Sequence, residues 1–517
     1  MLVYVNGAKC IGIDAVRVTV EVDIVSGIGI HLVGLADTAV KESLLRTITA
    51  LQSLEFHIPG KKIVINLAPA DLHKNGSGYD LPIALGIIAA SGQRSLPLLE
   101  RYVVMGELGL DGSIRPVPGA LPVADYAGKA GFDGCILPRE SAFEAVEYRD
   151  IDVYGVHSLT EVLDILGGGK DSSELLIWNC QECRDAEHPK SSATNLDIPD
   201  FADIVGQEGA KRGAEIACAG SHNMILVGPP GSGKSSLAKA IAGILPPMTM
   251  EESIETSKIY SIAGISRGGF GLIRSRPFRA PHYSASLAAI IGGGGGDSIL
   301  PGEVTLSQNG VLFMDEFGQM PKSVVEALRG PLEDRKVMIS RLRSKVEYPA
   351  SFMLVAASNP CPCGYYGEGD RCTCTPSRRM AYLGRLSGPI LDRIDLHVWM
   401  QPVSSAMMMG HEKGERSSVI AERVMRARDI QEERFRDDDI HSNAEMTPRQ
   451  IERYCQLSPQ GREAMEKILQ RMNMSMRAFH RILKLARTIA DLAGCRDILP
   501  EHLMEAASFR FLDKISV

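Results

Sequence analysis

The sequence predicts an α/β multidomain protein: an α+β domain, a core with a parallel sheet, and a C-terminal helical domain. Three observations predict this fold class. Short β-rich runs alternate with helical runs over residues 1–166, buried apolar runs that end in polar residues recur over 199–404, and a helical period of apolar residues dominates 405–517. Residues 167–198 are polar and irregular, as expected for a linker. A chain of 517 residues has room for about three domains with separate cores.

Composition limits the classes of function. The net charge of −7 gives no overall attraction to nucleic acid, so a polyanion site must be a local patch. The start, MLVYVNGAKC, has no signal-peptide pattern, and the longest apolar run, LPIALGIIAASG, is too short to span a bilayer. Eleven cysteines without secretory context indicate reduced thiols or a bound metal. We therefore expect a cytoplasmic protein that does not cross a membrane.

The first region has the pattern of an α+β domain. VRVTVEVDIV and KKIVINLAP read as strands, and AVKESLLRTITALQS and YDLPIALGIIAASG read as helices. A hairpin with its turn at Asp111-Gly112 is expected further along, followed by a helix and an apolar strand.

The loop KNGSGYDLP, residues 74–82, raises the question of a nucleophile. Ser77 lies between two glycines, but a serine without an adjacent general base is a weak nucleophile. The segment GELGLDGSIRPVPGALPVADYAGKAG, followed by CILP, resembles the proteolytic domain of the Lon protease family, which has an S5 domain 2-like fold. The resemblance places that family's catalytic Ser and Lys at Gly78 and Leu121, which can act as neither nucleophile nor base. We expect a non-catalytic Lon-like domain.

The stretch MILVGPPGSGKSSLAKAIAGIL is the strongest signal in the chain. An apolar run, Met224 to Val227, leads into a glycine-rich loop, and a helical pattern follows it. Such a loop directs backbone N–H groups at phosphate oxygens, while Lys234 would reach the β- and γ-phosphates and the Ser235 hydroxyl would bind Mg²⁺. The predicted nucleotide-binding residues are Gly228, Pro229, Pro230, Gly231, Ser232, Gly233, Lys234, Ser235 and Ser236.

Three further runs place polar residues at strand ends. GVLFMDEF ends at Asp315, predicted to hold Mg²⁺, and Glu316, predicted to polarise the attacking water; FMLVAASNP delivers Asn359 to the same edge. In LSGPILDRID, Arg393 is either an ion-paired surface residue or a finger that reaches a neighbouring subunit. The series resembles AAA+ ATPases, which implies hydrolysis of ATP.

Two basic insertions are candidate polyanion sites. Between Glu255 and Asp297 there is no acidic residue, and the stretch ends in five glycines. Its basic residues are Lys258, Arg267, Arg274, Arg276 and Arg279. It is either a solvated loop or a polyanion-binding loop, and we favour binding.

The second basic insertion, DRKVMISRLRSKVEYP, reads as a hairpin with Arg341, Arg343 and Lys345 near its turn. In helicase-type AAA+ proteins such a hairpin projects into the ring pore. These three residues, with the arginines of the first insertion, are the hypothesised DNA contacts.

Four cysteines lie in one loop, NPCPCGYYGEGDRCTCTP. Cys361, Cys363, Cys372 and Cys374 offer four sulfurs, which suits tetrahedral Zn²⁺, and ordinary reduced thiols are the alternative. We favour a structural zinc site and expect it to be remote from hydrolysis.

Several motifs together resemble the magnesium-chelatase-like AAA+ ATPases of the ComM/YifB group. They are GQEGAKRGAEIACAGSHNMILVGPPGSGKSSLAKAIAGILPP, RPFRAPHYSAS, PGEVTLSQNGVLFMDE, SNPCPCGYYG and RAFHRILKLARTIADLAG. The resemblance covers nearly the whole chain and implies a bacterial cytoplasmic ring ATPase, hexameric when active and linked to branch migration of DNA joints during transformation. It also implies a C-terminal lid, with Arg477 as a second sensor; His480, Arg481 and Lys484 are expected on a solvated face.

Three functions therefore compete. A DNA translocase or branch-migration motor is favoured. A chelatase-type motor that remodels a protein partner is the first alternative, although the Lon-like domain is unusual for that role. An ATP-dependent protease is disfavoured because Gly78 and Leu121 replace the catalytic pair.

Overall fold

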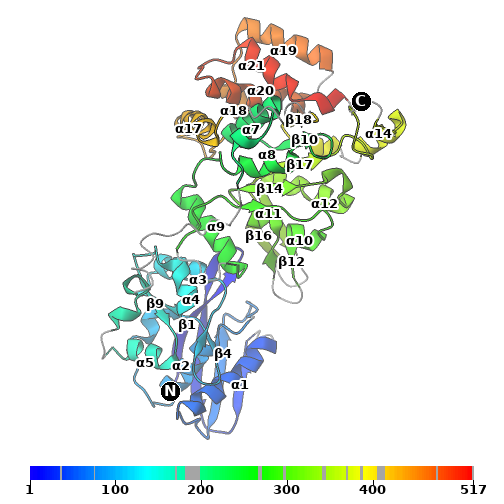
Figure 1. Cartoon of the computed structure of the whole chain (residues 1–517). Helices are drawn as coiled ribbons and strands as arrows, with labels where there is room; N and C mark the ends of the chain where they lie inside the picture. Colours follow the sequence, from blue (N-terminus) through cyan, green and yellow to red (C-terminus); the bar gives the residue numbers. More distant parts are fainter. Residues whose placement is uncertain are drawn as a thin grey trace.

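The computed structural model confirms a mixed α/β fold with a parallel core sheet and a helical C-terminal region (Figure 1). The structure describes residues 1–34, 38–74, 76–168, 172–180, 198–265, 271–294, 299–340, 345–367, 371–384, 388–403, 414–472 and 475–514. Of the predicted site residues, Arg267, Arg341 and Arg343 lie outside these ranges.

A seven-stranded mixed sheet forms the centre of the N-terminal domain, in the order β3-β4-β2-β1-β5-β8-β9. Its strands are β1 (Val3–Ile11), β2 (Asp14–Val25), β3 (Ile30–Val33), β4 (Lys62–Ala68), β5 (Tyr102–Val104), β8 (Gly134–Pro138) and β9 (Asp152–Val156). Strands β2 and β4 confirm the two predicted runs. Strand β1 was not predicted, yet it pairs antiparallel with β2 and parallel with β5 at the centre of the sheet.

Helices cover this sheet and a small hairpin extends from it. The helices are α1 (Thr38–Ser53), α2 (Asp80–Ala90), α3 (Ala120–Lys129), α4 (Arg139–Ala142) and α5 (Leu159–Gly167). Helix α2 is buried on nearly every side, as its apolar sequence predicts. The hairpin pairs β6 (Glu107–Leu108) with β7 (Ile114–Arg115) across the predicted Asp111-Gly112 turn, where Gly112 has a φ of 83°.

A short part of the linker packs on the N-terminal domain. Two 3₁₀ turns, Ser173–Leu175 and Ile177–Asn179, follow α5, and Ile177 is fully buried. Leu176 forms a bridge with Tyr154 of β9.

The second region contains a parallel five-stranded sheet in the order β11-β14-β17-β10-β18. Its strands are β10 (Met224–Val227), β11 (Phe278–Arg279), β14 (Val311–Met314), β17 (Met353–Ser358) and β18 (Leu396–Trp399). The central strands β10, β14 and β17 are buried along their whole length, as is usual for parallel sheets covered on both faces. Their carboxyl ends meet at one edge, where the polar motifs gather.

Short helices and two small ribbons surround this sheet. The helices are α7 (Glu208–Gly220), α8 (Lys234–Ile241), α9 (Met250–Ile262), α10 (Leu287–Ile291), α11 (Glu303–Leu306), α12 (Lys322–Ala327), α13 (Arg329–Asp334), α14 (Pro376–Leu383) and α15 (Gly388–Leu391). The ribbons pair β12 (Gly292–Gly293) with β13 (Leu300–Pro301), and β15 (Lys336–Ser340) with β16 (Lys345–Pro349). The second ribbon is the predicted basic hairpin.

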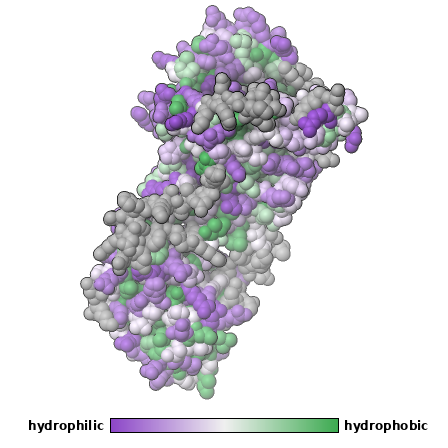
Figure 2. Space-filling view, viewed as in Figure 1, coloured by the Kyte–Doolittle hydropathy of each residue, from purple (hydrophilic) through white to green (hydrophobic). Residues whose placement is uncertain are grey.

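The C-terminal region is helical, as predicted. Its helices are α17 (Ser417–Arg434), α18 (Pro448–Tyr454), α19 (Pro459–Met472), α20 (Met476–Leu492) and α21 (Pro500–Ser508). The apolar face of α20 shares one buried cluster with α7 and β10: α20 packs on α7, which in turn packs on the core sheet. Among the described residues, no helix is both long and apolar enough to cross a membrane. Figure 2 shows polar side chains predominating over the upper part of the face in view.

One expectation for α20 is wrong. Arg481 and Lys484 do not form a solvated face: Arg481 makes an ion pair with the buried Asp395, and the Lys484 Nζ donates a hydrogen bond of 2.8 Å to the Ala444 carbonyl. Burial lowers the pKa of Lys484 to about 8. Asp395 also lies 3.1 Å from Nδ1 of the buried His222, so a polar network joins the core to the C-terminal helices. The helical period of apolar residues predicted the apolar face of α20 but not these polar contacts.

The N-terminal domain and the core meet beside α9, and side chains of each region pack into the other (Figure 1). Ile13, in the turn between β1 and β2, packs against the apolar cluster beneath the core sheet. Leu272 and Ile254 of the core pack in return into an apolar cluster of the N-terminal domain. Lys258 of α9 is buried at this junction.

Candidate nucleotide-binding site

The phosphate loop, residues 228–235, joins the end of β10 to the start of α8. Gly231 and Gly233 have φ values of 78° and 88°, which strain any residue with a side chain. A Cβ at Gly228 would lie 2.6 Å from the Met400 carbonyl oxygen, so this position too accepts only glycine without a shift. The sequence therefore gives the loop the shape that lets backbone N–H groups surround a phosphate.

Lys234 lies at the mouth of this loop. Its Nζ donates hydrogen bonds of 2.8 Å to the carbonyl oxygens of Gly228 and Pro229, and lies 3.5 Å from Oδ1 of Asn359. Burial lowers the pKa of Lys234, and the charges of Asp315 and Glu316 oppose that shift. Its acceptors are main-chain carbonyls rather than a fixed carboxylate, which suits a cation that binds phosphate.

Ser235, Asp315 and Glu316 lie together beside the phosphate loop. Ser235 Oγ donates a hydrogen bond of 3.0 Å to Asp315 Oδ2, so the two expected Mg²⁺ ligands are adjacent. Glu316 has left-handed backbone angles, φ 49° and ψ 38°, and its N–H donates a 2.8 Å hydrogen bond to Asp315 Oδ1. Such strain in a non-glycine residue is common at functional sites.

A buried polar atom supports the fit of a phosphate group. The Ser232 hydroxyl is buried, and among the described residues it has no hydrogen-bond partner. A buried hydroxyl without a partner is costly unless something else satisfies it. Together with Lys234, it fits a nucleoside triphosphate and its Mg²⁺ at this loop.

Gln207 is a residue that sequence reasoning missed. Its Nε2 donates hydrogen bonds to the carbonyls of Ser232, at 3.2 Å, and Gln401, at 2.6 Å, and its Oε1 accepts one from the Gln401 N–H. Gln207 thereby joins the start of α7, the phosphate loop and the segment after β18. No spacing rule points to it, because its partners are 25 and 194 residues away.

Within a single chain the two predicted arginines do not join this group. Arg393 is nearly buried, makes an ion pair with Glu333 and donates a 2.7 Å hydrogen bond to the Pro389 carbonyl. Arg477 is exposed, 4.0 Å from Asp392, at the start of α20. An action across a subunit interface remains a prediction for both.

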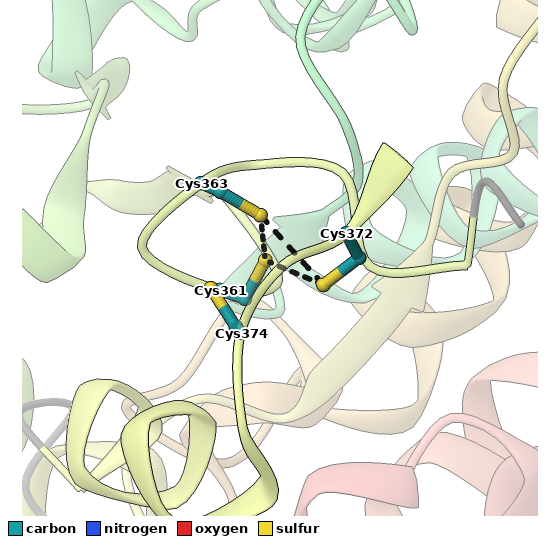
Figure 3. Close-up of side chains that lie close together, drawn as sticks. All are labelled: Cys361, Cys363, Cys372 and Cys374. Atoms are coloured by element: carbon teal, nitrogen blue, oxygen red, sulfur yellow. Dashed lines mark hydrogen bonds between the residues drawn. The ribbon is translucent and has the colours of Figure 1, made fainter. Parts of the chain in front are cut away.

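The four cysteines converge as their spacing predicts (Figure 3). All four sulfur atoms lie within 4.8 Å of one another, and Cys361 Sγ is 3.3 Å from Cys363 Sγ and 3.8 Å from Cys372 Sγ. Four sulfurs gathered in one loop are the donor set that zinc prefers.

The expectation that this loop is remote from hydrolysis is wrong. Cys361 follows Asn359 by two residues, and Gly364 packs against Pro230 of the phosphate loop. The loop is therefore a neighbour of the nucleotide site.

The first basic stretch does not leave its described cations free, contrary to expectation. Their carboxylate partners come from other parts of the chain: Lys258 pairs with Asp125 and Asp14, Arg274 with Glu147, Arg276 with Glu252, and Arg279 with Glu303. A stretch without acidic residues is thus neutralised by the fold. Lys258 and Arg274 bind the N-terminal domain, which makes their role structural.

The basic hairpin is only partly described. Lys345 is exposed and pairs in register with Ser340 at the end nearest the turn. Behind it the hairpin packs on the N-terminal domain, where a Cβ at Gly12 would lie 2.8 Å from the Glu347 carbonyl oxygen.

In the loop of residues 74–82, the polar side chains of Ser77 and Lys74 have partners of their own. Ser77 Oγ donates to Glu107, and the buried Lys74 donates to the Pro69 carbonyl. Leu121 is fully buried, and a Cβ at Gly78 would lie 2.8 Å from Met105 Cε. Neither Gly78 nor Leu121 carries a nucleophile or a base, and the absence of protease activity stays a prediction.

Known proteins share this organisation. Models described as "Magnesium chelatase, subunit ChlI", "Subunit ChlI of Mg-chelatase" and "Magnesium chelatase, subunit ChlI C-terminal" match residues 200–408, 20–141 and 414–510. The uncharacterised protein YifB of Salmonella typhimurium is 40% identical over 100% of this chain and 98% of its own length. Competence protein ComM of Haemophilus influenzae is 41% identical over 99% and 98%. An archaeal Lon protease of Methanocaldococcus jannaschii is 23% identical over 31% of this chain and 26% of its own length.

The likeness to YifB and ComM covers all the regions described above, including the phosphate loop and the C-terminal helices. The match to the archaeal Lon protease supports the Lon-like similarity. The chain therefore belongs to the ComM/YifB family of magnesium-chelatase-like AAA+ proteins.

Proposed function

We propose that this protein is a Mg²⁺-dependent ATPase that works as a ring motor on DNA. The observation that carries the ATPase part is the meeting of Lys234, the Ser235–Asp315 pair and Asn359 at one strand edge. Lys234 would hold phosphate oxygens, and Ser235 with Asp315 would hold Mg²⁺, which would supply positive charge opposite the phosphates. Glu316 orients and deprotonates the attacking water, and Asn359 fixes its position.

The ring part of the proposal rests on Arg393. An arginine finger acts from a neighbouring subunit on the transferred phosphate, and to act as one Arg393 would leave Glu333, which is exposed, and the Pro389 carbonyl on assembly. Mixing tests this: inactive Arg393→Ala subunits and inactive Lys234→Ala subunits should together regain activity, because some interfaces then hold both residues. An Arg393→Ala variant with normal activity would reduce Arg393 to a structural ion pair. Arg477 is proposed as the second sensor, and a hexamer as the working state.

The DNA part rests on the basic hairpin and on the name of the competence protein among the relatives. The pairing of Lys258, Arg274, Arg276 and Arg279 leaves Arg341, Arg343 and Lys345, with Arg267, as the proposed phosphate contacts. Such contacts release counterions, so binding should weaken steeply with salt and show little sequence preference.

The test is the ATPase rate of the full chain with single-stranded, duplex and four-way-junction DNA. We expect stimulation by DNA, and its loss in the triple variant R341A/R343A/K345A with basal hydrolysis retained. Lys336→Ala is the matched control, because Lys336 lies on the same hairpin but pairs with Glu347 at 2.8 Å. Equal stimulation of the triple variant would favour the alternative, a chelatase-type motor that remodels a protein partner.

We also propose that Cys361, Cys363, Cys372 and Cys374 bind a structural zinc ion and that the protein acts in the cytoplasm. Zinc should co-purify at about one ion per chain. The double variant C361S/C363S should lose it, whereas Cys495→Ser, outside the cluster, should not. Absence of metal from protein prepared without chelators would leave these residues as ordinary thiols.

A further inference from the structure

We infer that the thiolate loop, residues 361–367 and 371–374, is a wall of the nucleotide site whose zinc centre sets the position of the phosphate loop. The inference rests on the proposed ATPase and zinc functions. It assigns to the loop a role beyond stapling an insertion.

The first link is along the chain. Strand β17 ends at Ser358, Asn359 follows, and the fully buried Cys361 is the next residue but one. Two residues allow little independent movement. The Asn359 amide, which lies 3.5 Å from Lys234 Nζ, is therefore anchored on one side by the sheet and on the other by a metal ligand.

The second link is a contact across the site. The Gly364 N–H donates a 3.0 Å hydrogen bond to the Cys361 carbonyl, which closes a tight turn between the first two sulfurs. This turn rests on the phosphate loop: a Cβ at Gly364 would lie 3.0 Å from Pro230 Cδ and 3.1 Å from Cγ. Pro230 has a rigid ring and a fixed φ, so the turn meets a surface that transmits a shift rather than absorbing it.

The third link supports the loop from behind. The Arg379 guanidinium, on α14, lies 3.9 Å from the centroid of the Tyr366 ring, and Tyr366 meets Trp399 edge-on at 6.4 Å. Trp399 ends β18, and the next residue, Met400, packs against Gly228. The loop thus contacts the phosphate loop directly at Pro230 and indirectly through Met400.

The thiolate loop accordingly touches three parts of the site: the Asn359 segment, Pro230 and the end of β18. Zinc held by all four sulfurs fixes the spacing between these contacts. Release of the ion lets the turn at Gly364 relax away from Pro230, and the phosphate loop and Asn359 then lose their common support. Nucleotide affinity and hydrolysis should both fall, although no thiol touches the nucleotide.

A matched pair of glycines separates this role from simple stability. Gly364 and Gly367 both have left-handed φ values, 86° and 96°, so alanine costs similar backbone strain at either. Only Gly364 meets the phosphate loop, because a Cβ at Gly367 points to Trp399 Cζ2 at 3.6 Å. We expect Gly364→Ala to weaken binding of a non-hydrolysable ATP analogue by about tenfold, and Gly367→Ala by less than about twofold.

Zinc content and melting temperature are measured on the same samples, and both variants should retain zinc and melt alike. Equal analogue affinity in the two variants, at full zinc content, overturns the inference. A second arm removes zinc from the wild-type chain with a chelator and adds it back: affinity should fall and then recover. Unchanged affinity after full removal of zinc also overturns the inference.

Failure of the proposed zinc site or of the proposed ATPase would give other results, which can be told apart. Wild-type protein without zinc overturns the metal centre and its control of the loop. Wild-type protein with zinc but without nucleotide binding overturns the proposed ATPase instead.

Discussion

Two loops in this protein share the tripeptide Gly-Ser-Gly ahead of a helix, and only one is built to bind an anion. Residues 76–78 precede α2 in the N-terminal domain, and residues 231–233 precede α8 in the core. In the first, the Ser77 hydroxyl donates to Glu107. In the second, the Ser232 hydroxyl has no partner among the described residues.

The first helical residue decides the difference. Helix α2 starts with Asp80, a fully buried carboxylate held by Arg46, Ser43 and the Leu108 N–H. Helix α8 starts with Lys234. A helix N-terminus attracts negative charge, and α2 supplies that charge itself, whereas α8 adds a cation and leaves the place for a phosphate. We therefore expect these similar loop sequences to differ in function, because the first satisfies its own polar groups.

We expect the largest difference in ATP hydrolysis between two single variants, Lys234→Ala and Lys74→Ala. Lys234→Ala should reduce ATP hydrolysis by roughly 10²–10³-fold, because a positioned charge is lost where phosphate charge develops. Lys74→Ala should leave the rate per folded molecule unchanged. Phosphate release at saturating ATP measures both, with Glu316→Gln as a control that should still bind ATP. Similar losses of ATP hydrolysis in the two lysine variants would contradict the different roles assigned to the two loops.

Removing the carboxylate at the first loop should cost stability instead of activity. Asp80→Ala leaves the partly buried Arg46 without its partner, and breaking such a pair typically costs about 3 kcal/mol. Denaturant unfolding should show this loss while nucleotide affinity at 25 °C stays unchanged. Gain of phosphate binding at this loop would show that Asp80 alone had excluded the anion, and loss of ATP binding would contradict the independence of the loops.

Stability should depend on pH at Glu144, which lies beside Leu121, the residue at the Lon family's lysine position. Burial raises the pKa of nearby Glu144 to about 7, while hydrogen bonds from the Ser261 hydroxyl and the Leu121 N–H oppose the shift. A carboxyl with a raised pKa binds its proton more tightly in the folded state, so its stabilisation is full below pH 4.5 and is lost as pH rises through 7. Between pH 5 and 7 the free energy of unfolding should fall by about 2 kcal/mol from this group. Glu144→Gln should flatten that slope in melting curves, and an unchanged slope would assign it to other groups.

Ser77→Ala should give the smallest effect. Its hydroxyl has a single carboxylate partner in a half-buried loop, so we expect a loss of about 1 kcal/mol or less. Casein cleavage should be absent in both wild type and variant. Peptide hydrolysis that the substitution abolishes would restore the loop as a catalytic one.

Local patterns predicted much of this molecule. The strand before Gly228, the glycines at left-handed positions and Lys234 depend on neighbours in sequence, so the phosphate loop could be identified directly. The convergence of Asp315 and Asn359 followed from one rule, that parallel strands end at the same edge. Four cysteines in one short loop could also be grouped from spacing.

Contacts between distant segments could not be predicted. The partners of Lys258 and Arg274 belong to the N-terminal domain, so a stretch without acidic residues looked more positive than it is. Gln207 acts through carbonyl groups, which leave no mark in a sequence. Arg481 lies on a helix whose apolar face was clear, and its polar contact with Asp395 depends on how that helix docks.

At the domain junction, Ile13 of the N-terminal domain packs on the core and Leu272 of the core packs on the N-terminal domain. This mutual packing should affect how the protein unfolds on heating. Each side chain completes an apolar cluster of the other region, so neither region can unfold without exposing apolar surface on its neighbour. Heating should then give one endotherm with coupled cooperativity rather than two separated peaks. A shortened chain that begins at residue 199 would leave Val346 without the cover of the β1–β2 turn, and would be prone to aggregate when expressed alone.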